Sequence, residues 1–486
     1  MENTNHNERA DRLAKLEKIS TQANPYPSRV NRTNTIEEVL TNFSDLEKNK
    51  TIVSLAGRVL GIRTHGNLSF VNLKDGTSEI QLACSKNELG AEDYKEFTKL
   101  VDMADFIEVS GTCFVTHKGQ NSILVNKYRI ISKALLPLPE KWHGLKDEEE
   151  RLRKRYLDLL LDDDLKELFV KKAKFWQVTR DFMLRKGFCE VETPILETTT
   201  GGAEARPFKT HHNDFDLDVY LRISVGELWQ KRLMAAGYEK TFEIGKIFRN
   251  EGSSPDHLQE FTNMEFYWAY ANYEDGMSIS QELYREIAVQ VFGTTKFKTK
   301  EYEYDLADDW KRIDYREEVL KQTGIDVLEA SEQEMANKLQ ELKVKYDGQT
   351  RERLMDTLWK YCRKSIAGPA FLINHPKLVS PLSKSREDNP ELTERFQIII
   401  AGSEVGNGFS ELNDPVDQRK RFEEQQSLID RGDDEAMMPD WEFVEMLEHG
   451  MPPACGFGFG ERLFAFMANK PVRETTLFPL LKPKKE

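Results

Sequence analysis

The sequence runs Phe242-Glu243-Ile244-Gly245-Lys246-Ile247-Phe248-Arg249-Asn250-Glu251 and then, after a loop holding His257, Phe261-Thr262-Asn263-Met264-Glu265-Phe266-Tyr267. We interpret these two runs as neighbouring strands joined by a charged loop, which together form one hairpin. The hairpin gathers side chains of complementary chemistry: Arg249, Glu251, His257, Phe261 and Glu265. Arg249 can bind two oxygens of a phosphate or a carboxylate, and Phe261 can stack on a purine. The loop can cover a polyphosphate, so the hairpin predicts a nucleotide site.

Two further blocks lie on either side of this hairpin in the sequence. Arg185-Lys186-Gly187-Phe188-Cys189-Glu190-Val191-Glu192-Thr193-Pro194 joins a helix end to a strand that a proline ends. Phe457-Gly458-Phe459-Gly460-Glu461-Arg462-Leu463 has glycines that enter an apolar helix with an arginine at its start. Glycines let the backbone approach a nucleotide closely. Taken alone, each of these two blocks is more typical of ordinary structure or packing than of a site.

The composition excludes several classes of protein. The chain has 486 residues, enough for about three domains, and it is 39% hydrophobic and 31% charged. No run approaches the roughly 18 continuous apolar residues of a membrane helix. Five scattered cysteines argue against a disulfide framework and a cysteine-based zinc site, and the start lacks a basic and then apolar leader. We therefore expect a soluble, cytoplasmic protein with no membrane partner.

The net charge of -14 argues against a protein that coats nucleic acid without specificity, because phosphate contacts need clustered Lys and Arg. It leaves room for local contact with RNA. Residues 51–137 nearly balance their charges and are the least acidic part of the chain. They also contain about five short β-rich runs, which predicts a small barrel of the OB type, a fold often used on single-stranded nucleic acid.

The rest of the chain divides around this barrel. Residues 1–50 are polar, and we predict an extension with one short helix over Ala10–Ile19. The Pro-rich junction Leu136-Pro137-Leu138-Pro139 marks the boundary, and a charged helix is predicted over Glu148–Leu161. Residues 138–486 mix amphipathic helices with strands, and a helical insertion is predicted at about 310–362.

Together and in this order, the three blocks resemble the three signature motifs of the class II aminoacyl-tRNA synthetases. The whole chain, from Asn24-Pro25-Tyr26-Pro27 to Pro483, resembles the bacterial class II lysyl-tRNA synthetases. Further stretches carry this resemblance: Trp142-His143-Gly144-Leu145, Arg155-Tyr156-Leu157-Asp158-Leu159, Gly201-Gly202-Ala203-Glu204-Ala205-Arg206-Pro207-Phe208, Thr210-His211-His212-Asn213, Ser380-Pro381-Leu382, Gly406-Asn407-Gly408-Phe409-Ser410-Glu411-Leu412-Asn413-Asp414 and Gly432-Asp433-Asp434-Glu435-Ala436. It implies an α+β fold, with an antiparallel sheet flanked by helices after an N-terminal OB-fold barrel.

The resemblance also implies an activity: lysine is activated with ATP and then joined to the 3′ end of tRNA(Lys). It implies two catalytic arginines, Arg249 between the lysine carboxylate and the α-phosphate, and Arg462 on the far phosphate. The residues implied around ATP are Arg249, Glu251, His257, Phe261, Glu404 and Arg462. Glu265, Glu411 and Tyr267 are implied near the ε-amine of lysine, Glu227 and the Gly202 backbone near its α-amine, and Asn407 and Phe409 at the wall.

Anticodon binding, metal binding and assembly are implied in the same way. Phe70 and Gln81 match positions that stack on and hydrogen-bond to the central anticodon uridine in the family, with Arg63 nearby. The alternative is that Phe70 only packs in the hydrophobic core of the barrel. The family is dimeric through the first block, so a homodimer is expected. It binds Mg²⁺ with two glutamates, whereas this chain has Glu404 and, at the earlier position, Gln397.

Other departures from the family pattern lie near the same site. Asp256 stands just before His257, where relatives commonly have a basic residue, and Ser224-Val225-Gly226-Glu227 is one residue longer than usual. The glycines Gly456, Gly458 and Gly460 lie one position closer to Arg462.

Two other functions compete with the tRNA ligase. One is a lysyl-transferring paralogue that modifies a protein, although such relatives usually lack the barrel. The other is a catalytically inactive RNA-binding homologue, against which the retained Arg249, His257 and Arg462 argue.

Overall fold

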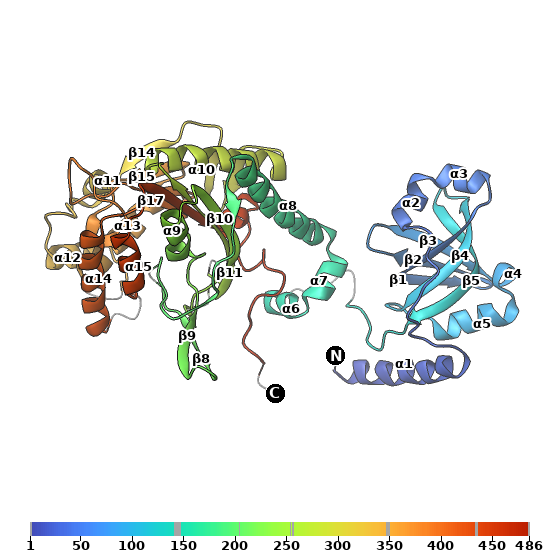
Figure 1. The fold of residues 1–486 in the computed structure, drawn as a ribbon. Coiled ribbons are helices and arrows are strands. Elements are labelled where there is room, and N and C mark those ends of the chain that lie inside the picture. The colour runs from blue at the N-terminus through green and yellow to red at the C-terminus, as the bar shows by residue number, and fades with distance from the viewer. Residues whose placement is uncertain are drawn as a thin grey trace. The chain divides into compact units, whose positions relative to one another are not determined.

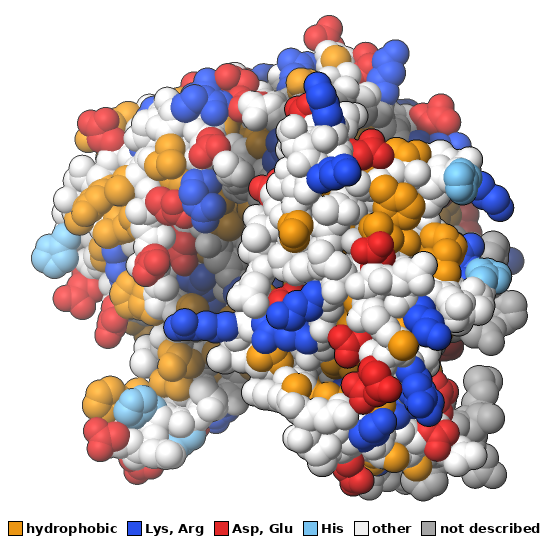
Figure 2. All heavy atoms as spheres, turned by 90° about the vertical axis from the view of Figure 1, so that its right-hand side faces the viewer, with side chains coloured by type: hydrophobic (Ala, Val, Ile, Leu, Met, Phe, Trp, Pro, Cys, Tyr) orange, Lys and Arg blue, Asp and Glu red, His pale blue; other side chains and the backbone are white. Residues whose placement is uncertain are grey.

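The computed structural model describes residues 2–139, 147–203, 205–252, 254, 257–346, 350–432 and 436–484. The chain forms two compact units, Met1–Lys146 and Asp147–Glu486 (Figure 1). Within the described residues, no helix is both long enough and apolar enough to cross a lipid bilayer. On the face that Figure 2 shows, basic and acidic side chains are interspersed over the surface.

The first unit contains a closed five-stranded barrel, which confirms the predicted OB-type fold. Its strands follow each other around the barrel in the order β1-β2-β3-β5-β4, and only the β3–β5 pair is parallel. The barrel strands are β1 (Ile52–His65), β2 (Leu68–Lys74), β3 (Glu79–Ser85), β4 (Phe106–Val115) and β5 (Asn121–Ser132), with α4 (Lys86–Leu89) and α5 (Ala91–Leu100) between β3 and β4. Inward-facing side chains such as Leu55, Val71 and Leu82 fill the core.

The segment before the barrel is more ordered than the sequence analysis predicted. The first helix, α1, spans Glu2–Gln22 rather than Ala10–Ile19, and α2 (Ile36–Thr41) and α3 (Phe43–Lys48) follow it. Ile36, Val39 and Phe43 are buried in the barrel core. The second half of the predicted 1–50 extension therefore packs with the barrel, because these three side chains belong to the same buried cluster as the barrel strands.

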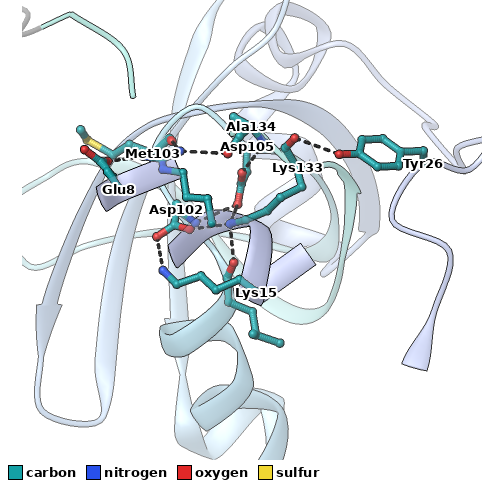
Figure 3. A network of polar contacts seen from close by, with 10 residues as sticks. Glu8, Lys15, Tyr26, Asp102, Met103, Asp105, Lys133 and Ala134 are labelled. Atoms are coloured by element: carbon teal, nitrogen blue, oxygen red, sulfur yellow. Dashed lines mark hydrogen bonds and ion pairs between the residues drawn. The ribbon is translucent and has the colours of Figure 1, made fainter. Parts of the chain in front are cut away.

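Polar contacts fasten α1 to the barrel (Figure 3). Arg12 donates from Nη1 to the backbone carbonyls of Met103 and Ala134, at 2.9 and 3.1 Å. Behind it, the fully buried Lys133 ammonium lies 2.7 Å from a carboxylate oxygen of Asp105. A buried charge needs such a partner, because an unpaired one is very costly in the interior.

An eight-stranded sheet forms the centre of the second unit, in the order β14-β15-β16-β17-β18-β11-β10-β6. Neighbouring strands are antiparallel except for the outer pairs, β14–β15 and β10–β6, which are parallel. The strands are β6 (Cys189–Glu190), β10 (Lys240–Phe248), β11 (Glu260–Ala269), β14 (Lys311–Asp314), β15 (Ala370–Ile373), β16 (Arg395–Ile400), β17 (Ser403–Ser410) and β18 (Ala454–Gly460). The predicted α+β class with a mainly antiparallel sheet is confirmed.

One face of this sheet is apolar and is covered by two long helices, α8 (Asp163–Arg185) and α10 (Tyr273–Ile287). Phe266 lies opposite Phe242 on one side and Phe457 on the other. The rings of Phe396 and Phe457 stack with centroids 5.6 Å apart. Because successive side chains in a strand point to opposite faces, the residues between these phenylalanines point to the other face.

The remaining elements surround the sheet. They are α6 (Glu148–Arg153), α7 (Arg155–Leu161), β7 (Leu196–Glu197), β8 (Phe208–His212), β9 (Leu217–Leu221), α9 (Glu227–Ala235), η1 (Ala288–Phe292), β12 (Lys296–Thr299), β13 (Tyr302–Asp305), α11 (Tyr315–Thr323), α12 (Glu332–Glu341), α13 (Arg351–Cys362), η2 (Arg363–Ser365), η3 (Lys377–Val379), α14 (Pro415–Asp430), α15 (Trp441–Glu448) and α16 (Arg462–Met467).

Two predicted elements of this unit differ from those observed. The helix predicted over Glu148–Leu161 is two helices, α6 and α7, which break at Lys154. The helical insertion predicted at about 310–362 begins with a strand of the main sheet, because β14 pairs with β15 at the sheet edge. The helices α11, α12 and α13 then form a cluster with its own buried core.

Candidate active site

The second face of the sheet carries a row of residues across five strands, which are polar except for one glycine. Glu265 lies opposite Glu243 on β10 and opposite Gly458 on β18. Gly458 in turn lies opposite Asn407, and Asn407 opposite Gln397. The next row holds, in the same strand order, Thr241, Tyr267, Gly456, Phe409 and Arg395. Candidate residues from distant parts of the sequence therefore converge on one face because the strands that carry them are neighbours.

A cavity of about 530 Å³ opens over this face. Eight of the predicted site residues line it: Gly202, Glu227, Arg249, Glu251, Gln397, Glu404, Asn407 and Phe409. Three residues expected around the lysine ε-amine, Glu265, Tyr267 and Glu411, are buried and do not belong to its lining. Each of these three buried residues interacts electrostatically with Glu227, which does line the cavity.

A second cavity, of about 210 Å³, adjoins the first. All six residues expected around ATP line it: Arg249, Glu251, His257, Phe261, Glu404 and Arg462. The two cavities share four lining residues, Arg249, Glu251, Glu404 and Asn407. Asn263, which the sequence analysis did not assign, also lines the second cavity, and its buried Oδ1 has no hydrogen-bond partner among the described residues.

Arg249 and Arg462 place two guanidinium groups in the second cavity. Arg249 follows β10 directly, and its N–H donates to the carbonyl of Gln259 at 2.9 Å, which closes the hairpin. Its guanidinium carbon lies 5.5 Å from the centre of the Phe261 ring. Burial lowers the pKa of Arg249. The negative charges of Glu251 and Glu265 oppose this shift, whereas the positive charge of Arg462 adds to it. Two cations held this close can bind a polyphosphate.

Glu265 is a buried carboxylate beside this pair. Its Oε1 accepts from the Val225 N–H at 2.7 Å, and its Oε2 accepts from the Tyr267 hydroxyl at 3.2 Å. Burial, together with the neighbouring Glu227, raises the pKa of Glu265 to about 7. A cation that arrived beside Glu265 would favour its ionised form, because an opposite charge stabilises the charged state.

Glu227 and Gly202 lie against each other at the cavity wall. Gly202 has a φ of +91°, and a Cβ there would lie 2.7 Å from the Cβ of Glu227 and 2.8 Å from its Oε2. Glycine therefore lets one carboxylate oxygen of Glu227 lie beside the backbone. This pair offers an oxygen and a backbone segment to an ammonium group in the cavity.

The glycines of the third block lie in a strand, β18, that leads into an apolar helix, and this helix, α16, begins at Arg462 as predicted. A Cβ at Gly456 would lie 2.2 Å from Oε1 of Glu411, and one at Gly458 would lie 2.7 Å from Cγ of Glu265. The absence of side chains at these two positions of β18 makes room for two buried carboxyl groups.

The sequence analysis missed Lys231, one turn after Glu227 on α9. Its Nζ lies 2.8 Å from Oε1 of Glu227 and 2.5 Å from Oε2 of Glu411. The signal that points to it is the Glu–Lys spacing of four residues on a helix, which brings the two side chains together.

The residues expected to hold Mg²⁺ supply few ligands. Oε1 of Glu404 lies 2.5 Å from Nη1 of Arg363. Oε1 of Gln397 lies 3.2 Å from Nε2 of the buried His375. Among the described residues, no group of three or more His, Cys, Asp or Glu side chains could hold a metal ion. One carboxylate and one amide fit a Mg²⁺ ion whose other ligands are phosphate oxygens, rather than an all-protein cage.

The three anticodon candidates share a region of the barrel surface. Arg63 lies opposite Phe70 across β1 and β2, and Gln81 lies on β3 beside β2. The alternate residues of β2 that fill the core are Val71 and Leu73, whereas Phe70 is only half-buried on the outer side. This placement argues against the core-filler alternative for Phe70.

Some sequence calls lie outside the described residues. They are Asp256 beside His257, the stretch Trp142-His143-Gly144-Leu145, and Glu204 and Asp433-Asp434-Glu435 within two of the longer stretches.

Comparisons with known proteins agree with this architecture. Residues 147–482 match the family described as tRNA synthetases class II (D, K and N), and residues 53–131 match an OB-fold nucleic acid binding domain. A lysine–tRNA ligase of Thermotoga maritima is 44% identical over 98% of this chain and 96% of its own length. Lysine–tRNA ligases of Thermotoga sp. (strain RQ2) and Clostridium tetani are 45% and 43% identical, over 95% and 94% of this chain and 93% and 92% of their own lengths.

The barrel, the mainly antiparallel sheet and the adjoining cavities thus define a class II aminoacyl-tRNA synthetase with an OB-fold domain. Within that class, the chain belongs to the lysine–tRNA ligase family.

Proposed function

We propose that the protein is a lysine–tRNA ligase, which forms lysyl-adenylate and pyrophosphate from L-lysine and ATP and then transfers lysine to the 3′ end of tRNA(Lys). The observation that carries the proposal is the wall shared by the two cavities. Arg249 lies between a cavity backed by buried carboxylates and a cavity lined by Phe261 and Arg462. A positively charged amino acid in the first cavity would present its carboxylate to a nucleotide in the second.

Activation then requires no covalent enzyme intermediate. A carboxylate oxygen of lysine attacks the α-phosphorus of ATP, and the bond to pyrophosphate breaks. The protein contributes position and charge stabilisation. Arg249 bridges the carboxylate and the α-phosphate, Arg462 holds the far phosphate, and Phe261 stacks on adenine, with Glu251 and His257 on the nucleotide. In the second step the tRNA 3′ hydroxyl attacks the carbonyl carbon, and AMP leaves.

Selection of lysine rests on charge in this proposal. An ammonium that leaves water needs carboxylates and hydrogen bonds around it. Glu265 and Glu411, with Tyr267, receive the ε-ammonium, and Glu227 with the Gly202 backbone receives the α-ammonium. Asn407 and Phe409 complete the wall, which they already line.

Two assays test the function. Lysine-dependent ATP–pyrophosphate exchange measures activation, and aminoacylation of a tRNA with a UUU anticodon measures transfer. We expect both activities. Absence of exchange would favour an inactive RNA-binding homologue, and exchange without charging of tRNA would favour a paralogue that modifies a protein. The barrel supports the tRNA ligase over that paralogue.

We further propose that Mg²⁺ enters with ATP and that Glu404 is its principal protein ligand. Gln397 offers a neutral oxygen, so the protein compensates less of the metal charge than two glutamates would. We predict that Gln397→Glu lowers the Mg²⁺ concentration needed for half-maximal exchange. Direct Mg²⁺ titration in the presence of ATP measures this, with Gln425→Glu, a buried glutamine of α14, as the matched control. An unchanged requirement in Gln397→Glu would show that Gln397 is not at a ligand position.

We propose that the barrel surface around Phe70 binds the anticodon. Stacking on one aromatic ring is worth about 1–3 kcal/mol, so Phe70→Ala should lower kcat/KM for tRNA charging by about 10- to 100-fold. Exchange, which needs no tRNA, should keep its rate. Phe114→Ala is the control, because Phe114 is another half-buried phenylalanine on the barrel strands. Equal losses in the two variants would exclude a specific role for Phe70.

Assembly and location complete the proposal. We propose a homodimer, supported by exposed apolar side chains directly after the first sequence block, Ile195 and Leu196, and on the nearby β8–β9 turn, Phe215. We propose a cytoplasmic location, supported by five cysteines that are all free. The mass of the particle in solution tests the first of these.

A further inference from the structure

Lys231 is a buried ammonium inside the proposed lysine site. Its side chain is 1% exposed, and its Nζ contacts one carboxylate oxygen each of Glu227 and Glu411. The aromatic rings of Phe409 and Tyr267 lie 5.2 and 5.9 Å from the nitrogen. Carboxylates and ring faces together stabilise a cation that has left water.

Each carboxylate that contacts Lys231 keeps a second oxygen for another partner. The other oxygen of Glu227, Oε2, lies beside Gly202 at the cavity wall. The other oxygen of Glu411, Oε1, is buried and has no hydrogen-bond partner among the described residues. Lys231 therefore contacts one oxygen of each carboxyl group. The second oxygen of Glu227 lies at the cavity wall, and that of Glu411 lies against Gly456, which is paired in the sheet with the cavity-lining Phe409.

The site holds three carboxyl groups, Glu227, Glu265 and Glu411. Lys231 contacts Glu227 and Glu411, and Arg249 interacts electrostatically with Glu265. The two ammonium groups of lysine would favour the ionised forms of Glu265 and Glu411, whose pKa burial raises. The carboxylate of lysine is left for Arg249. A site with Lys231 removed would carry one more negative charge, and a buried carboxylate without a partner takes up a proton instead.

We propose that Lys231 is a positioning residue for lysine recognition, which holds the carboxyl groups of Glu227 and Glu411 in place so that their second oxygens accept the substrate ammonium groups. This inference rests on the proposed function, because it concerns the same amino-acid site. Lys231 itself does not touch the substrate.

The groups that face Glu411 set the pH dependence of this site. They are Lys231 and Glu227 from α9, Glu265 and Tyr267 from β11, and Cys455 from β18. Burial raises the pKa of Glu411, Lys231 opposes that rise, and the two other glutamates add to it. Removal of Lys231 thus leaves only influences that favour the protonated carboxyl, which cannot bind an ammonium.

The test is calorimetric binding of L-lysine without ATP to the full-length protein between pH 6 and 8.5, together with KM values from exchange. In Lys231→Met we expect lysine affinity at pH 7 to fall by about tenfold or more, which corresponds to one pKa unit. Affinity should recover as pH rises, over a higher range than in the unsubstituted protein, where Lys231 opposes the rise in the pKa of Glu411. KM for ATP should change less than twofold. Unchanged or tighter lysine binding in a folded variant would overturn the proposal.

Two further measurements separate this role from a merely structural one. Lys133→Met removes a buried lysine that also contacts two carboxylates, Asp102 and Asp105, but in the barrel, and it should leave lysine affinity unchanged. Binding enthalpies in different buffers give the protons released with lysine. We expect more protons to be released at pH 7 in Lys231→Met, or in Lys231→Gln if the former does not fold, than in the unsubstituted protein, because Lys231 no longer opposes the rise in the pKa of Glu411. Equal release in the variant and the unsubstituted protein would contradict this role of Lys231.

The outcomes distinguish this inference from the proposed function. An unsubstituted protein that binds no lysine contradicts the function itself. One that binds lysine and whose Lys231→Met variant behaves identically contradicts only the role of Lys231.

Discussion

Arg249→Met is expected to lower kcat/KM for lysine-dependent ATP–pyrophosphate exchange by about 10³-fold. Removal of a single preorganised donor to a developing negative charge costs about 10²- to 10³-fold, and Arg249 is proposed to serve both the carboxylate and the α-phosphate. It lines both cavities, so its loss affects lysine and ATP together. Exchange kinetics with each substrate varied in turn measure the effect.

A matched control separates this loss from a general effect of charge. Arg312 lies on β14 of the same sheet and forms an exposed ion pair with Glu274, which is worth at most about 1 kcal/mol. Arg312→Met should retain the exchange rate of the unsubstituted protein. If Arg249→Met lost less than tenfold while it remained folded, Arg249 would not bridge the reacting groups, and the proposed placement of lysine would be wrong.

The parts of the site that the sequence predicted are those carried by short, continuous motifs. Arg249, Glu251, His257 and Phe261 come from one hairpin, and their shared cavity follows from the pairing of β10 with β11. The barrel was predictable because core positions alternate with outer positions along strands such as β2. The local sequence pattern was therefore sufficient to predict those parts of the fold and site in which residues close in sequence are also close in space.

The parts that the sequence did not predict depend on contacts between distant segments. In the sequence, Lys231 looks like any other charged residue of a helix. Only the fold brings Glu411, which directly follows β17, into contact with it. The polar strand β14 joins the sheet only because β15, more than fifty residues later, pairs with it. Ile36 and Phe43 could not be assigned to the barrel core from a polar segment, because only the folded barrel provides the apolar surface that they cover.

Glu265→Gln is expected to raise KM for lysine in exchange by about 100-fold, with KM for ATP nearly unchanged. The substitution keeps an oxygen that can accept from Val225 N–H, but it removes the charge that faces the ε-ammonium. Loss of one partner of a buried charge pair costs about 2–5 kcal/mol, and 100-fold lies within that range. The neutral analogue norleucine, which lacks the ε-amine, should lose much less affinity than lysine.

Glu243 supplies the control for this substitution because it lies directly opposite Glu265 on β10. Its carboxylate already has a partner, since Oε1 lies 2.6 Å from Nη1 of the buried Arg222. Glu243→Gln should therefore lower the melting temperature, because it leaves an uncompensated buried guanidinium, while KM for lysine stays within about threefold. Two neighbouring carboxyl groups on one sheet thus have different expected phenotypes. Glu243 serves stability through its ion pair with Arg222, and Glu265, which interacts with Arg249 electrostatically, is proposed to receive the ammonium group of the substrate. Equal shifts of KM in the two variants would contradict that distinction, and with it the proposed basis of lysine selection.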